Sequence, residues 1–113
     1  MSTESWSEPK RPEWFEEALR IHKVATKHLT ARHEVWRFLS IALAEEAGEV
    51  CGVVKKHWRG SMTFEEMLPK IREEMADVRI YLEALAWRLN TDLDKEVQKK
   101  LEEVKTREFA NRE

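Results

Sequence analysis

Apolar residues recur every three or four positions in four stretches of this chain, which is the period of a helix with one buried face. The four stretches cover residues 12–30, 34–57, 63–89 and 92–109. Thr63 and Glu66 have the spacing of a capping box, which predicts a short helical turn, and Pro69 then restarts the chain into the third long helix. Because no stretch alternates apolar and polar residues as a strand does, the sequence predicts an all-α fold of four helices.

These helices are expected to form one domain over residues 12–113, preceded by a flexible tail over residues 1–11 that mixes Ser, Glu, Pro and Lys. A chain of 113 residues buries only about two-thirds of the surface that it exposes when unfolded, so its core is small. We therefore expect a four-helix, bundle-type fold with a modest core that homo-oligomerisation would help to complete.

Charge and composition exclude several classes of partner. The chain has 20 basic and 22 acidic residues and a net charge of -2, so it has no general attraction to nucleic acid or to a membrane surface. It also has no apolar run long enough to cross a membrane. The single cysteine, Cys51, lies in an apolar helical stretch, which predicts a buried, inert thiol in a reducing cytoplasm.

Acidic residues interrupt the apolar face of the second predicted helix. At 100° per residue, Val35 and Leu39 lie within about 20° of Glu46 around the helix. Glu49 lies about 60° away, still on the predicted buried face, and Glu45 lies about 100° away, at its margin. A charged carboxylate in the middle of an apolar face costs several kcal/mol unless it is paired or binds a metal.

The third predicted helix repeats this pattern. Tyr81 and Leu85 lie within about 40° of Glu74, and Asp77 lies about 60° from it. Helical bundles build metal sites from carboxylates that project inward from facing helices. Four acids without a softer ligand favour Mg²⁺, which Mn²⁺ can replace, and Mg²⁺ takes phosphate oxygens among its remaining ligands.

Three alternatives to a magnesium site apply to these acids. Pairs of acids three residues apart are common on solvated helix faces, and Lys56, Lys70 and Arg88 are available as ion-pair partners for buried acids. A di-iron carboxylate site requires Glu-x-x-His on two helices, and no Glu of this chain is followed by His three positions later. Two acid pairs on two apolar faces therefore favour the magnesium site over these alternatives.

Two motifs resemble those of a known family. Residues 43–50, LAEEAGEV, are similar to the EExxE motif of the MazG-like family of all-alpha nucleoside triphosphate pyrophosphohydrolases, which includes small dCTP pyrophosphatases and dimeric dUTPases. Residues 73–78, EEMADV, are similar to its ExxD motif, and the resemblance extends over about residues 38–107. The chain departs from the family at Val104 and at Phe38, where relatives carry Asn.

The resemblance implies a fold, a reaction and a set of roles. It implies Mg²⁺ ligands at Glu46, Glu49, Glu74 and Asp77 and a water-orienting or water-deprotonating role for Glu45. It implies cleavage of a nucleoside triphosphate between the α- and β-phosphates, giving a monophosphate and pyrophosphate, in the service of removing unwanted nucleotides. It also implies a homo-oligomer, either a dimer or a dimer of dimers.

Further residues are candidates for contacts to the nucleotide. Trp36 can stack on a base, with His33 beside it. Lys56 projects on the same side as Glu49, and Lys100 and Arg107 share a face of the last predicted helix, so these three are candidates for binding phosphates. Two rival functions use the same acids. One is a module that binds Mg²⁺ and nucleotide without turnover, and the other is a structural interaction protein whose acids form ion pairs with Lys and Arg across a subunit interface.

Overall fold

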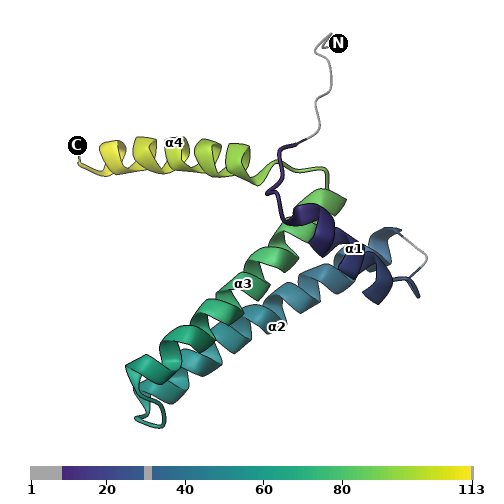
Figure 1. The fold of residues 1–113 in the computed structure, drawn as a ribbon. Helices are drawn as coiled ribbons and strands as arrows, with labels where there is room; N and C mark the ends of the chain where they lie inside the picture. The colour runs from purple at the N-terminus through teal and green to yellow at the C-terminus, as the bar shows by residue number, and fades with distance from the viewer. Residues whose placement is uncertain (1–8, 30–31, 113) are drawn as a thin grey trace, which may run out of the picture.

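The computed structural model describes residues 9–29 and 32–112, and these form four helices with no strand among them (Figure 1). The helices are α1 (Phe15–Ala25), α2 (Arg32–Trp58), α3 (Phe64–Arg88) and α4 (Leu93–Arg112). The prediction of an all-α fold with four helices is confirmed. None of the described helices is long and apolar enough to span a membrane.

The centre of the molecule is an antiparallel hairpin of α2 and α3 (Figure 1). The α2 helix ends at a turn where Gly60 adopts φ 82°, a left-handed conformation that glycine tolerates without strain, and the Ser61 amide donates to the Lys56 carbonyl at 2.9 Å. Val35 and Leu39 pack against Ala84 to form the core at the other end of the hairpin. These apolar positions hold the two acidic helices in a fixed register.

The third helix is continuous, and the prediction of a restart at Pro69 is wrong. Thr63 and Glu66 form the predicted capping box, in which the Thr63 hydroxyl accepts from the Glu66 amide at 3.1 Å. Pro69 lies in the second turn of α3, so its ring removes only the hydrogen bond to the carbonyl of Glu65, and that residue is exposed to water. The capped first turn therefore continues directly into the long helix.

The α1 helix lies across the upper end of the hairpin and packs on α3 (Figure 1). Phe15 is almost fully buried and contacts the ring of Trp87, with 6.4 Å between ring centroids. The helix ends at Ala25, earlier than the predicted end near residue 30. Thr26 explains the early end, because its hydroxyl donates to the His22 carbonyl at 2.7 Å and its own carbonyl accepts from the Leu29 amide.

A tight junction directs α4 away from the hairpin (Figure 1). Asn90 adopts φ 52°, and the Thr91 amide donates to the Ala86 carbonyl at 2.8 Å. Arg11 anchors this turn: its guanidinium donates to the Thr91 carbonyl at 2.6 Å and lies 4.0 Å from the carboxylate of Glu83. Arg11 belongs to the predicted flexible tail, residues 1–11, and residues 1–8 of that tail lie outside the described part of the chain.

The single chain is much less compact than a globular domain of its length. Its radius of gyration is 18.1 Å, against about 13 Å for a compact chain of this size. Cys51 is exposed, so the prediction of a buried thiol is wrong for the single chain. The reason is that Cys51 lies on the side of α2 that faces away from α3, about 140° from Glu46 around the helix.

Candidate functional site

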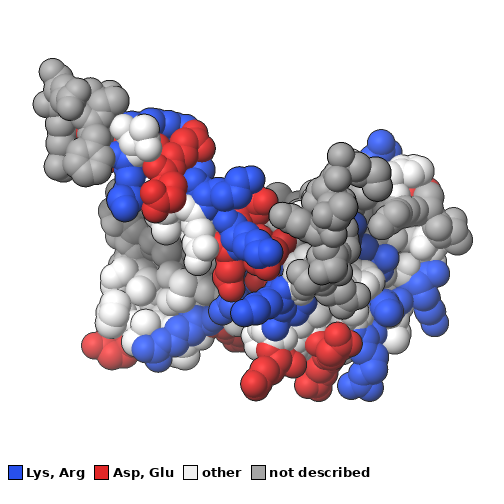
Figure 2. All heavy atoms as spheres, turned by 90° about the horizontal axis from the view of Figure 1, so that it is seen from above, with Lys and Arg blue, Asp and Glu red and all other residues white. Residues whose placement is uncertain are grey.

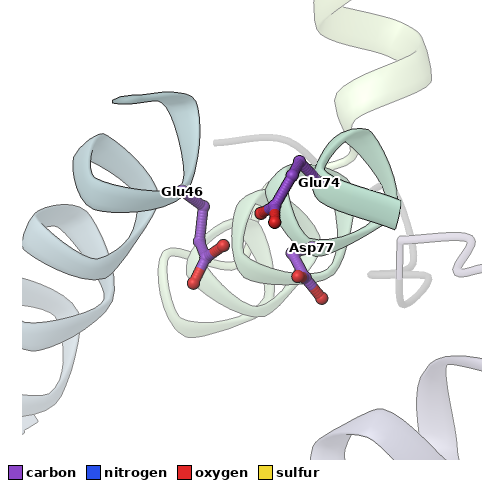
Figure 3. A group of neighbouring side chains, drawn as sticks. All are labelled: Glu46, Glu74 and Asp77. Atoms are coloured by element: carbon purple, nitrogen blue, oxygen red, sulfur yellow. The ribbon is translucent and has the colours of Figure 1, made fainter. Parts of the chain in front are cut away.

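Three of the four predicted metal ligands meet between α2 and α3. Glu46 comes from the middle of α2, and Glu74 and Asp77 come from successive turns of α3 that face it (Figure 3). One carboxylate oxygen from each of the three residues lies within 4.8 Å of the others. Their meeting follows from the hairpin, which pairs the middle of one helix with the middle of the other.

The spacing of these oxygens fits a small divalent cation after a slight closure. Mg²⁺ binds oxygen at about 2.0–2.1 Å, so two of its ligands lie at most about 4.2 Å apart. The observed limit of 4.8 Å exceeds that by roughly half an ångström, which small rotations of flexible carboxylate side chains can close. Three oxygen donors without nitrogen or sulfur are the ligand set that Mg²⁺ or Mn²⁺ prefers.

The acids differ in how far they are withdrawn from water. Glu46, Glu74 and Asp77 are half-buried, whereas Glu49 and Glu45 are exposed. The prediction that Glu49 lies on the buried face is wrong for the single chain, because Glu49, about 60° from Glu46 around the helix, lies on an edge of α2 that remains exposed. Glu45 lies at the margin of the site, as its angle around the helix predicts.

The carboxylates of the cluster repel one another. Partial desolvation raises the pKa of Glu46, and repulsion from Asp77, Glu74, Glu49 and Glu45 raises it further. The pKa of Glu74 is also raised, by desolvation first and then by repulsion from Glu49 and other neighbouring acids. A bound cation would remove this repulsion.

No basic side chain forms an ion pair with the cluster within the described residues. The ion pairs that join two described residues lie between Arg11 and Glu83 or within α4. None of them involves Glu46, Glu74 or Asp77. The explanation of these acids as intramolecular ion pairs is therefore wrong for residues 9–29 and 32–112.

Tyr81 borders the acids and His22 packs on Tyr81, and the sequence did not single out either as a site residue. Desolvation raises the pKa of Tyr81, and so do the nearby charges of Glu46, Asp77 and Glu45. The ring of His22 meets that of Tyr81 edge-on, with 4.9 Å between centroids, and His22 itself is buried. The available signal was the position of Tyr81 four residues after Asp77, which places both on one face of α3.

The predicted base-binding residues lie apart from the acids within one chain. Trp36 is partly exposed and carries the Arg37 guanidinium 5.6 Å from its ring centroid, and His33 is exposed. Trp36 lies ten residues before Glu46, about 15 Å along the helix, and about 180° around it from Glu45. Within one chain the fold therefore does not bring Trp36 and His33 to the acid cluster.

The predicted phosphate-binding residues are also dispersed. Lys56 is exposed near the end of α2, on the same edge as Glu49. Lys100 and Arg107 lie on α4, where both pair with Glu103, Lys100 at 3.6 Å and Arg107 more closely. Because α4 leaves the hairpin (Figure 1), these two cations are not brought to the acids of their own chain.

No protein-family model, curated protein or solved structure matches this chain.

Proposed function

We propose that this chain is a Mg²⁺-dependent nucleoside triphosphate pyrophosphohydrolase of the MazG-like type. The observation that carries the proposal is the meeting of Glu46, Glu74 and Asp77, whose oxygens lie within 4.8 Å of one another with no ion-pair partner among the described residues. The EExxE and ExxD motifs that supply these residues support the same class of enzyme.

The residues of the cluster have distinct roles in this proposal. Glu46, Glu74 and Asp77 hold the cation, and the exposed Glu49 joins them when substrate binds. Mg²⁺ supplies Lewis-acid polarisation of phosphoryl oxygens and neutralises their charge. Glu45 accepts a proton from the water that attacks phosphorus, while the bridging bond between the α- and β-phosphates breaks and pyrophosphate leaves.

The remaining contacts come from more distant residues and require association of chains. The exception is Lys56, which is exposed on the same edge of α2 as Glu49 and binds a phosphate within the same chain. Lys100 and Arg107 bind phosphates, and Trp36 with His33 contact the base. Their separation from the acids within one chain supports a homo-oligomer, a dimer or a dimer of dimers, that acts on the nucleotide pool of the cytoplasm.

The decisive experiment is incubation of the protein with Mg²⁺ and a panel of ordinary and modified nucleoside triphosphates, with the products resolved by chromatography. The proposal expects a monophosphate and pyrophosphate in equal amounts, and the rates rank the substrates. Release of a diphosphate and inorganic phosphate would contradict it, and so would the absence of any product.

Variants test whether the acid cluster performs the reaction. Glu46→Gln and Asp77→Asn should abolish turnover with an unchanged far-ultraviolet circular dichroism spectrum, because each removes a charge with little change of shape. Glu65→Gln is the matched control, because it changes an exposed acid in the first turn of α3. Full activity of Glu46→Gln or Asp77→Asn would show that the ligand set is wrong. Nucleotide binding without product would identify a binding module instead.

A further inference from the structure

A groove on the outer side of α3, the α3 groove, is apolar and basic and has no acid among its lining residues. It has a volume of about 490 Å³ and is lined by Trp14, Arg72, Met75, Ala76, Arg79 and Ile80. The five residues that α3 contributes are centred about 170° around the helix from Glu74. The α3 groove and the acid cluster therefore lie on opposite sides of α3, and a partner held in the groove would not contact the proposed metal site.

The two arginines of the α3 groove have no acid partner in the described part of the chain. Along α4, by contrast, basic side chains lie beside acidic ones (Figure 2), and three lysines there lie 3.6–3.7 Å from glutamate carboxylates. Arg72 and Arg79 form no ion pair with a described residue, and Glu83, one turn after Arg79, pairs with Arg11 instead. A carboxylate from another molecule would therefore meet two cations without a competing acid in the groove.

The spacing of the two arginines matches two acids that are seven residues apart on another helix. Arg72 and Arg79 lie about 10.5 Å apart along α3 and about 20° apart around it. Met75 and Ala76 lie between them along the helix, and Met75 is 49% exposed. A helix packed along this line, with apolar residues between its two acids, would match both the charges and the apolar surface.

Trp14, which precedes α1, borders the groove and orients Arg79. It is 37% exposed, and the Arg79 guanidinium lies 5.7 Å from its ring centroid. This contact restricts the Arg79 side chain before a partner arrives, so less conformational entropy is lost when its N–H groups bind a carboxylate. Trp, Met and Arg are also enriched at the centres of protein interfaces, so the composition of the groove suits a protein partner.

A small molecule and a second copy of this chain both fit the α3 groove less well. Sites for small ligands enclose about 70–90% of the ligand surface, whereas four of the five residues that α3 contributes are exposed. On each of the other helices, a cation lies three or four positions from an exposed apolar residue: Lys27 beside α1, Arg37 on α2 and Lys100 on α4. Those faces of a second copy would bring like charges to Arg72 and Arg79.

We propose that the α3 groove binds an amphipathic helix of another protein, in which two acids seven residues apart enclose apolar residues. The partner helix lies along α3, with its apolar residues on Met75 and Ile80 and its two carboxylates on Arg72 and Arg79. The interaction requires neither Mg²⁺ nor nucleotide, so its test is independent of the proposed hydrolysis.

Fluorescence anisotropy with a defined peptide tests the groove directly. The probe is a fluorescein-labelled helical peptide of about 16 residues whose two glutamates lie seven positions apart with leucines between them. In the control peptide, lysines replace both glutamates. We expect the acidic peptide to bind the full chain with a dissociation constant of about 10–100 µM and the lysine peptide to bind at least about tenfold more weakly. Added NaCl should weaken binding of the acidic peptide.

Charge reversal in the protein locates the bound peptide. Arg72→Glu should weaken binding of the acidic peptide by about tenfold or more and should strengthen binding of the lysine peptide. Met75→Asp should weaken binding of both peptides, because it removes apolar contact. Lys27→Glu is the matched control, because it reverses a cation beside an exposed apolar residue of α1 and should leave both affinities unchanged. A circular dichroism spectrum confirms that each variant is helical.

Any of four results would overturn the proposal. One is equal affinity for the acidic and lysine peptides, and another is an equal loss of affinity in Arg72→Glu and Lys27→Glu. A third is no binding of the acidic peptide to the wild-type chain, which is the result expected if a second copy of the chain covers the groove. The fourth is co-sedimentation of the chain with vesicles of anionic phospholipid that is lost in Arg72→Glu, because the groove would then bind a membrane surface.

Discussion

Binding of Mg²⁺ should stabilise this protein against heat, and the effect should depend on Glu46. The three oxygens within 4.8 Å need only a small closure to bind the ion, so the folded chain is close to a preformed site. For a dissociation constant of about 1 mM, 10 mM free Mg²⁺ stabilises the folded state by about 1.4 kcal/mol. For a chain of this length that corresponds to a rise in melting temperature of roughly 6 °C.

Glu46→Gln should remove most of this rise. The amide keeps the shape of the side chain but removes one of three negative charges, and it weakens the site enough that 10 mM Mg²⁺ shifts melting by less than about 1 °C. Without metal, Glu46→Gln should melt at or above the temperature of the wild type, because repulsion from Asp77 and Glu74 is relieved.

The assay is thermal unfolding followed by circular dichroism, with and without MgCl₂ and with NaCl added to equalise ionic strength. MnCl₂ is a second titrant, since the same oxygen ligands accept it. Glu65→Gln is again the control and should keep the full metal-dependent rise. An equal rise in the wild type and in Glu46→Gln would refute the reasoning, because the ion would then be acting elsewhere on the chain.

Four further predictions follow from the same structure. Glu45→Gln should lower kcat by about 10²- to 10⁴-fold while calorimetry with a non-hydrolysable α,β-imido nucleotide shows unchanged affinity; a large loss of affinity would instead make Glu45 a ligand. The pKa values of Glu46 and Glu74 are raised in the folded state, so the free energy of unfolding of the metal-free protein should fall as pH rises above the ordinary carboxyl value of 4.5. In urea titrations at several pH values, Glu46→Gln should show a weaker pH dependence than the wild type. An equal pH dependence of the two proteins would contradict the assignment. Thr63→Ala should cost about 1 kcal/mol in urea unfolding by removing the cap of α3. Leu39→Ala should cost about 2–5 kcal/mol because Leu39 is 2% exposed, and a cost below about 1 kcal/mol would mean that the core around it is loose.

The sequence by itself predicted the helices and the pattern of acidic residues that they carry. Helical periodicity is local, so the four stretches predicted four helices, and the Thr63 cap was predicted because it depends only on neighbouring residues of the backbone. The same periodicity placed Glu46 toward α3 and Glu45 at the margin. It also indicated that Glu74 and Asp77 share a face.

Only the tertiary structure decided which of these residues meet and which stay apart. The register of the hairpin brings Glu46 to Glu74 and Asp77 and leaves Glu49 exposed at an open edge. Cys51 is exposed because no described helix packs on the outer side of α2. Helical periodicity cannot reveal whether such a neighbour exists. The direction of α4 depends on the left-handed backbone of Asn90 and on the hydrogen bond from Arg11 to Thr91. Arg11 lies eighty residues before Thr91 in the chain, so this contact exists only once the helices have packed.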